Sequence, residues 1–270
     1  MIFNIKFSII ITSKFLLYFY ICLDKQKQII MSINKVSIVG IKGFKGSGKD
    51  TVASMISYIL HAGIMKASYD TWLLYHKNDF IENDEIIIHF ADKLKDDISE
   101  FCGIDRKLLD RQEIKENYYY NFKTGIVSTN IKDIDCVINT VLEYDNLSTL
   151  LLLNNNNVSI KIRALLQYYG TNVIRNHFWH EAFIRYTMNK AFDIKNSKGQ
   201  CIIADARFED ECMAIKYYGG KIIRVDRRVN NDNHESEQIK ISQDDYVIDN
   251  TGTLVGLFYK VLKFVTDYMV

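Results

Sequence analysis

Two kinds of hydrophobic pattern alternate along the chain. Short apolar runs rich in β-branched residues, such as 35–41 (KVSIVGI) and 201–205 (CIIAD), are typical of buried strands. Segment 50–63 instead spaces its apolar residues three and four apart, which predicts an amphipathic helix. Its apolar stripe consists of Val52, Met55, Ile56, Ile59 and Leu60. Strands that alternate with helices predict an α/β fold with a central parallel sheet flanked by helices.

The same patterns predict the remaining elements. We expect strands at 85–90, 221–225 and 246–249, and helices at 91–103, 209–220 and 253–269. Segment 160–192 is predicted to be mostly helical, with a break at Gly170–Thr171. The Tyr- and Asn-rich stretch 105–159, with NNNN at 154–157, is typical of a surface loop or an insertion.

A glycine-rich loop, GFKGSGKDT at 43–51, joins the first predicted strand to the first predicted helix. Glycines let backbone N–H groups point inward, and the helix adds its positive end, so the loop is suited to a polyphosphate. Lys49 would reach the β- and γ-phosphates. Asp50 stands where the common pattern has Ser or Thr. Thr51 is therefore the candidate hydroxyl ligand for Mg²⁺, and the loop predicts a P-loop NTPase fold.

The loop alone leaves a kinase, a GTPase and a motor ATPase open. Its form G-S-G-K-x-T is similar to that of nucleoside monophosphate kinases that resemble adenylate kinase. The strand-end Asp205 is followed by Ala206 and Arg207, without the second acidic residue that a motor uses to activate water. There is also no Asn-Lys-x-Asp segment for reading guanine. An arginine beside a strand-end carboxylate suits transfer between two phosphates, because charge on donor and acceptor must be neutralised together.

Composition adds limits of its own. The chain has 270 residues, is 48% hydrophobic and carries a formal net charge of +1, which fits a globular protein and gives no support for a nucleic-acid-binding surface. The five cysteines are scattered and form no C-x-x-C pair, which favours a reducing compartment such as the cytoplasm. His177 and His180 lack neighbours that would complete a metal set, so we interpret them as a structural pair.

The first 30 residues are the most apolar part of the chain. Lys6 and Lys14 interrupt them, so the longest uncharged run is shorter than the roughly 20 residues that span a bilayer. We expect 1–30 to be a leader outside the domain and no membrane anchor, with the kinase domain at 31–270. A protein that starts at Met31 should then be soluble and active.

Several segments, in this order along the chain, resemble the deoxynucleoside monophosphate kinases of bacteriophages and related viruses, members of the P-loop kinase superfamily. They are GFKGSGKDT (43–51), HFADKLKDDIS (89–99), RALLQYYGTNVIRNHF (163–178), IIADARFEDECMAI (202–215), NDNHESE (231–237) and YVIDNTGTLVGLF (246–258). The resemblance spans about 35–265 and is weak in the middle. The ordered set is far more specific than the loop alone.

The resemblance implies Mg-ATP as the donor and a deoxynucleoside monophosphate as the acceptor. It implies that the donor and its metal are held by Gly46, Gly48, Lys49, Asp50 and Thr51. It places on the acceptor side Lys45, Leu94, Lys95, Arg111, Arg163, Gly170, Thr171, Trp179, Asp205, Arg207 and Glu211. Lys49, Asp205 and Arg207 would be the catalytic residues, and about 105–185 would form a helical insertion that binds the acceptor.

The chain departs from the family at two of these positions. Gly46 replaces an arginine that some members carry in the loop, so that contact is missing or comes from Arg227 or Arg228. The family often has a tryptophan after the Gly-Thr pair. Trp179 is the match, with Phe183 as the alternative, and ordinary core packing explains either residue equally well.

Two other functions compete with this interpretation. One is a kinase similar to animal phosphomevalonate kinases, which share the G-K-D loop. The other is a nucleotide-binding regulatory or assembly protein without catalysis, which the glycine at position 46 favours. The resemblance to viral kinases also allows a homodimer, and for a viral chain the host cytoplasm would be the compartment.

Overall fold

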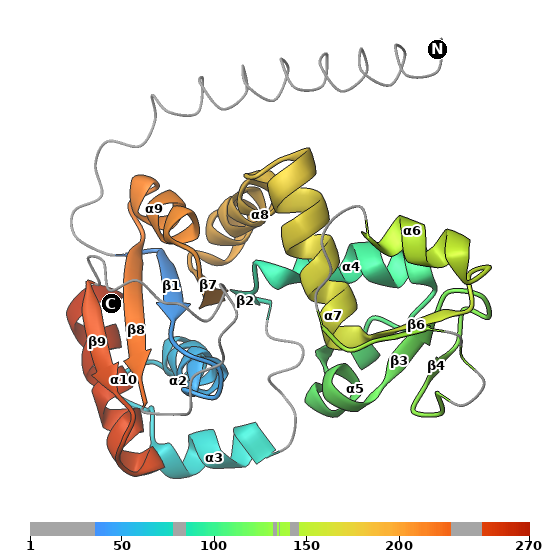
Figure 1. Ribbon diagram of the computed structural model, residues 1–270. Coiled ribbons are helices and arrows are strands. Elements are labelled where there is room, and N and C mark those ends of the chain that lie inside the picture. The colour runs from blue at the N-terminus through green and yellow to red at the C-terminus, as the bar shows by residue number, and fades with distance from the viewer. Residues whose placement is uncertain (1–35, 78–84, 132–133, 135, 141–145, 228–244) are drawn as a thin grey trace. The chain divides into compact units, whose positions relative to one another are not determined.

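The computed structural model describes residues 36–77, 85–131, 134, 136–140, 146–227 and 245–270. The apolar segment 1–30, Arg228 and the NDNHESE segment lie outside these residues. At the centre is a five-stranded sheet in the order β2-β7-β1-β8-β9 (Figure 1). Its strands are β1 (Ile38–Lys42), β2 (Ile87–Ile88), β7 (Cys201–Ala206), β8 (Lys221–Asp226) and β9 (Tyr246–Asp249).

All neighbouring strands of this sheet run parallel, as predicted. Val39 of β1 is level with Ile202 of β7, and Gly40 is level with Ile222 of β8. The carboxyl ends of the strands therefore meet at one edge, where such sheets bind ligands. Because β1 lies between β7 and β8, the loop that follows it emerges at the middle of this edge.

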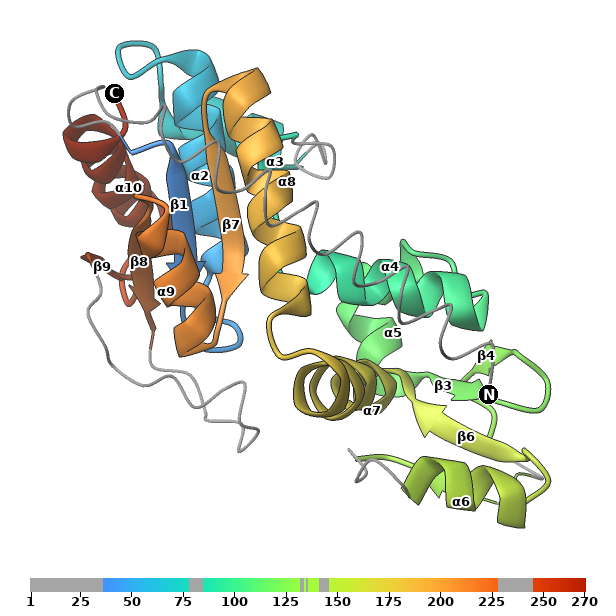
Figure 2. The same ribbon diagram turned by 90° about the horizontal axis from the view of Figure 1, so that it is seen from above.

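Helices cover both faces of the sheet (Figure 2). One face packs against α2 (Lys49–Ala62), α3 (Tyr69–Lys77) and α10 (Leu254–Tyr268), and the other against α8 (Ala182–Lys198) and α9 (Glu209–Tyr217). Alternate strand residues divide between the two cores, as the pleat requires. Ile202 belongs to the first core, and its neighbour Ile203 belongs to the second.

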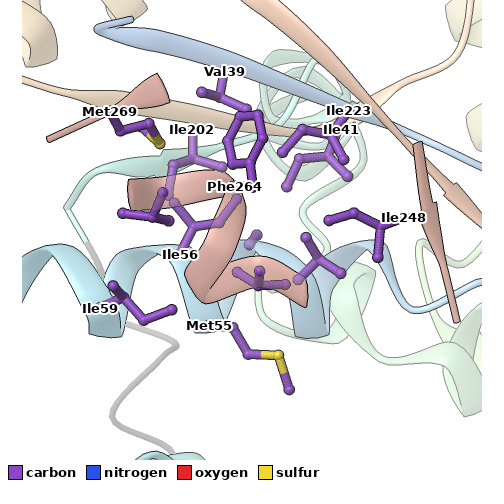
Figure 3. Packing of buried hydrophobic residues seen from close by; sticks show 14 of the residues in the cluster. Val39, Ile41, Met55, Ile56, Ile59, Ile202, Ile223, Ile248, Phe264 and Met269 are labelled. Atoms are coloured by element: carbon purple, nitrogen blue, oxygen red, sulfur yellow. The ribbon is translucent and has the colours of Figure 1, made fainter. Parts of the chain in front are cut away.

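The first core is large, and its apolar side chains pack closely against one another (Figure 3). Met55, Ile56 and Ile59 of α2 and Phe264 of α10 are all shielded from solvent in this cluster. Burying each such side chain contributes about 1.5–3 kcal/mol. This packing fixes the start of α2, and with it the glycine-rich loop, against the sheet.

A second group of elements is formed by the part of the chain that follows α4 (Ala91–Cys102) and precedes α8. It has its own four-stranded sheet, in the order β4-β3-β6-β5. The strands are β3 (Tyr119–Asn121), β4 (Val127–Ser128), β5 (Cys136–Ile138) and β6 (Val158–Lys161). The helices are η2 (Leu108–Asp110), α5 (Gln112–Asn117), α6 (Asn146–Leu153), α7 (Ile162–Gln167) and η3 (Tyr168–Phe178). The expectation of a helical insertion is thus incomplete, because a small sheet and a separate apolar core accompany the helices.

The predicted helix break at Gly170–Thr171 is wrong. The chain continues from α7 directly into η3, which is a π-helix. Gly170 instead allows close packing, since a Cβ there would lie 3.1 Å from Cδ2 of Leu94. Shorter π-helical turns are frequent at functional sites. Among the described residues, no helix is both long and apolar enough to cross a bilayer.

Candidate active site

The glycine-rich loop forms a tight cradle at the carboxyl end of β1. Gly46 and Gly48 have φ angles of 76° and 95°, which L side chains rarely adopt. A Cβ on Gly48 would lie 2.6 Å from Nδ2 of Asn250. The same Nδ2 donates a hydrogen bond of 2.8 Å to the carbonyl oxygen of Ser47. The turn after β9 therefore braces the loop in a shape that only glycine allows.

The cradle presents donors to an anion. Lys49 begins α2, and its Nζ donates to the carbonyl oxygens of Gly43 (2.7 Å) and Phe44 (2.8 Å). The lysine thus folds over the loop, where its ammonium can meet phosphate oxygens. No described side chain caps the N-terminus of α2, and the buried hydroxyl of Ser47 has no hydrogen-bond partner among the described residues. Open donors at a helix N-terminus fit a polyphosphate.

A charged histidine, which no sequence motif assigned to the site, connects the loop with the neighbouring strand end. Nε2 of His89 lies 3.6 Å from Oδ1 of Asp50, and its Nδ1 lies 3.6 Å from Oδ1 of Asp92. Burial alone would lower the pKa of His89, but the carboxylates of Asp50, Asp92 and Asp205 raise that pKa to about 10. His89 is therefore an imidazolium at neutral pH. Its place directly after β2 is the signal that could have marked it.

Asp205 anchors the start of α4 to the central sheet. It is the buried carboxylate at the carboxyl end of β7, and its Oδ1 accepts a hydrogen bond of 2.7 Å from the backbone N–H of Phe90. Its Oδ2 accepts one of 3.3 Å from the N–H of Ala91. A carboxylate at a helix N-terminus is stabilised by the helix dipole. Asp205 thereby holds α4, which carries Leu94 and Lys95, at the sheet edge.

Glu211, in the first turn of α9, performs a similar task. Its Oε2 accepts hydrogen bonds from the backbone N–H groups of Arg207 (2.8 Å) and Phe208 (3.1 Å), and its Oε1 from Nη2 of Arg175 (2.9 Å). Burial raises the pKa of Glu211 to about 7, although Arg175 favours the ionised form. The guanidinium of Arg175 lies 3.7 Å from the ring centre of Phe208. This network fixes the backbone of Arg207 beside the strand end.

These side chains surround a pocket beside the loop. Eight of the residues that the resemblance assigned to the acceptor line it: Leu94, Lys95, Arg163, Gly170, Thr171, Asp205, Arg207 and Glu211. The remaining lining residues are Phe90, Ala91, Lys115, Leu166, Gln167, Arg175, Phe183 and Phe208. The pocket combines cationic side chains with aromatic and aliphatic ones, as a phosphate-bearing ligand with a flat ring would require.

Three residues that the resemblance assigned to the acceptor do not line the pocket. Lys45 of the loop is exposed, and its Nζ lies 3.0 Å from Oε1 of Glu116 on α5. Arg111 is exposed at the start of α5. The ring of Trp179 instead lies near Arg185, whose guanidinium is 5.6 Å from the ring centre. Phe183, the alternative to Trp179, does line the pocket.

Counter-ions hold several of the pocket cations in place. Nζ of Lys95 lies 2.8 Å from Oδ1 of Asp110, and Nε of Arg163 lies 2.6 Å from Oε1 of Glu116. Burial would raise the pKa of Glu116, but Lys45 and Arg163 lower that pKa to about 2. A single carboxylate thus contacts both a loop lysine and a pocket arginine.

A candidate metal position can be named on the donor side. Among the residues that the structure describes, no group of three or more His, Cys, Asp or Glu side chains is arranged to hold a metal ion. Mg²⁺ in phosphotransferases is held largely by substrate phosphates and water, with few protein ligands. Thr51, in the first turn of α2, remains the candidate hydroxyl ligand. Arg227, a candidate substitute for the loop arginine that Gly46 replaces, is exposed after the end of β8.

Comparison with known proteins agrees with this geometry. Residues 37–261 match the model of the deoxynucleotide monophosphate kinase family. The deoxynucleotide monophosphate kinase of Escherichia phage RB69 is 25% identical over 245 residues, which cover 84% of this chain and 99% of the phage protein. The putative deoxynucleotide monophosphate kinase of Acanthamoeba polyphaga mimivirus is 26% identical over 235 residues, which cover 85% of this chain and 96% of the viral protein. With the phosphate loop, the parallel sheet and the adjoining pocket, this match makes the chain a member of the deoxynucleotide monophosphate kinase family.

Proposed function

We propose that the protein transfers the γ-phosphoryl group of Mg-ATP to a deoxynucleoside monophosphate, giving ADP and a deoxynucleoside diphosphate. One observation carries the proposal: a phosphate cradle and a cation-lined pocket adjoin the same carboxyl edge of the sheet. Asp205, at that edge, holds the helix that carries Lys95. The family match and the two viral relatives support the same reaction.

The loop 43–51 would hold the donor. Its backbone N–H groups and Lys49 fit the β- and γ-phosphates, because Gly46 and Gly48 adopt the positive φ angles that shape the cradle. The hydroxyl of Thr51 would hold Mg²⁺. The ion would supply neutralisation of the phosphate charge.

The pocket would hold the acceptor. Lys95, Arg163 and Arg207 would bind its phosphate and offset the repulsion between two anionic groups. Phe183 and Phe208 offer apolar surface to the base. The acceptor phosphate is already anionic, so the reaction needs no strong general base and no covalent enzyme intermediate. Positioning and charge neutralisation would therefore provide most of the rate enhancement.

A substrate panel tests the proposal. The full chain is mixed with Mg-ATP and each deoxynucleoside monophosphate, ribonucleoside monophosphate or phosphomevalonate, and ADP formation is measured. We expect turnover with at least one deoxynucleoside monophosphate. Turnover with phosphomevalonate alone would overturn the acceptor assignment. ATP binding without turnover of any acceptor would support a non-catalytic nucleotide-binding protein instead.

A further inference from the structure

One cation of the pocket differs from its neighbours in its surroundings. Lys115 lies on α5, is half-buried, and lines the pocket. Its ammonium forms no ion pair or hydrogen bond with any residue that the structure describes. By contrast, Lys95 contacts Asp110, Arg163 contacts Glu116, and Arg175 contacts Glu211.

The carboxylates around Lys115 are engaged elsewhere. Glu116, the next residue along α5, contacts Lys45 and Arg163. Asp110 contacts Lys95 and Arg106. α5 thus directs Glu116 to neighbouring elements and Lys115 into the pocket, while its other acidic side chain, Glu113, is exposed. A half-buried ammonium without a counter-ion is unfavourable unless a ligand supplies the negative charge.

The local field points to an anionic ligand. Burial and the positive charges of Lys95, Arg163 and Arg207 lower the pKa of Lys115 to about 8. The carboxylate of Asp110 acts in the opposite direction and raises this pKa. These groups come from α4, η2, α7 and the segment after β7, so positive charge reaches Lys115 from several elements. A dianionic phosphate in the pocket would relieve this repulsion.

We propose that Lys115 is a binding residue for the phosphate of the acceptor nucleotide, an inference that rests on the proposed kinase function. Different groups would bind the donor phosphates. The structure describes all residues of the loop 43–51, and none of them lines this pocket. Lys115 shares the pocket with Lys95, Arg163 and Arg207 and with the rings of Phe183 and Phe208. No sequence pattern indicated this residue, since α5 has only six residues.

The assignment has a pH signature. Protonated Lys115 binds phosphate and neutral Lys115 does not, so kcat/KM for the acceptor should fall as pH rises through about 8. Glu211 of the same pocket has a pKa of about 7 and adds negative charge on ionisation, which produces a separate, earlier decline. An arginine at position 115 would keep the charge across this range, because guanidinium does not titrate there. Only the decline near pH 8 should then disappear.

Steady-state kinetics with the full chain test the proposal. We expect Lys115→Met to raise KM for the deoxynucleoside monophosphate about 10- to 100-fold, as for loss of a charged hydrogen bond. KM for ATP should stay within about twofold of wild type, because Lys115 would contact only the acceptor. Lys115→Arg should bind the acceptor and lose the decline near pH 8. The matched control is Lys107→Met, which alters an exposed lysine outside the pocket.

Specific outcomes would overturn the role of Lys115. An acceptor KM equal to that of wild type in Lys115→Met is one, and a decline near pH 8 that persists in Lys115→Arg is another. If the wild type phosphorylates no deoxynucleoside monophosphate, the proposed function fails by itself. Calorimetric binding of inorganic phosphate and of deoxynucleoside monophosphates then decides: weaker binding in Lys115→Met supports an anion site, and equal binding rejects it.

Discussion

At the scale of single residues, the geometry of the phosphate loop depends on a few atoms. Nδ2 of Asn250 contacts the carbonyl oxygen of Ser47 and occupies the space where a Cβ of residue 48 would lie. Nζ of Lys49 bridges two loop carbonyl oxygens. The loop is therefore preorganised, with its cation already held over the place that a phosphate would take.

Replacing the loop lysine tests the donor side. Lys49→Ala should lower kcat by about a hundredfold or more, because it removes a cation that would stabilise the transferring phosphoryl group. Its thermal unfolding midpoint should change little, because Lys49 is only half-buried at the start of α2 and its side chain is not part of the hydrophobic core. Steady-state ADP formation and a melting curve measure both effects. Lys66→Ala, at an exposed lysine beyond α2, is the control, and turnover near wild type in Lys49→Ala would reject the site.

A pair of glycine substitutions tests the cradle. Gly48→Ala places a methyl group 2.6 Å from Nδ2 of Asn250 at a φ of 95°. Gly103→Ala imposes similar left-handed backbone strain at a φ of 65°, with no atom within 4 Å of the added Cβ. Both should lose about 1 kcal/mol or more of unfolding free energy, measured in urea. Only Gly48→Ala should also raise KM for ATP, and an equal KM in the two variants would contradict the cradle.

At the scale of elements, α5 connects the loop to the wall of the pocket. Its Glu116 contacts Lys45, which follows β1, and Arg163 of α7. The pKa of Glu116 is lowered to about 2, so its ionised form stabilises the fold. This contribution is present above the unfolded pKa of about 4.3 and is lost as pH falls through the folded pKa.

Neutralising this carboxylate should therefore have a pH-dependent effect. Glu116→Gln should reduce the free energy of unfolding by roughly 1 kcal/mol at pH 7, since solvent partly screens the pair. The difference from wild type should vanish as pH approaches 2. Urea unfolding at several pH values measures it. Glu113→Gln, on an exposed residue of the same helix, is the control, and a difference that is constant with pH would exclude the ion pairs as its cause.

The central elements could be predicted because their sequences are periodic. β1, β7 and α2 have uniform apolar runs or a clear helical stripe, and the strand-end rule located Lys49, Asp205 and Arg207 from the order of elements alone. The strands β3 to β6 have only two to four residues each, too few to display an alternating pattern. Lys115 and Gln167 reach the pocket through the packing of this small sheet and its helices, which no local pattern encodes.

At the scale of the whole molecule, the family match begins at the first strand of the central sheet. The match covers residues 37–261. β1, at the centre of the main sheet, starts at Ile38. The elements that form the pocket and the loop all follow it along the chain.

Removing the apolar N-terminal segment tests the domain boundary. A protein that begins at Met31 should keep kcat and both KM values within about twofold of the full chain, because the loop and pocket residues all follow β1. It should also unfold with an unchanged midpoint. ADP formation and thermal unfolding compare the two proteins. A loss of folding on truncation would place residues 1–30 inside the domain.

The carboxylate of Glu116 is shared between the loop and the pocket, and this has a thermodynamic consequence. A ligand that drew Arg163 away would leave Lys45 and Lys161 as the cations beside Glu116, and a ligand that drew Lys45 away would leave Arg163 and Lys161. The two halves of the site would then exchange free energy through one side chain. Linkage requires this exchange to be reciprocal, so any change that one nucleotide makes in the affinity of the other is returned by the same factor.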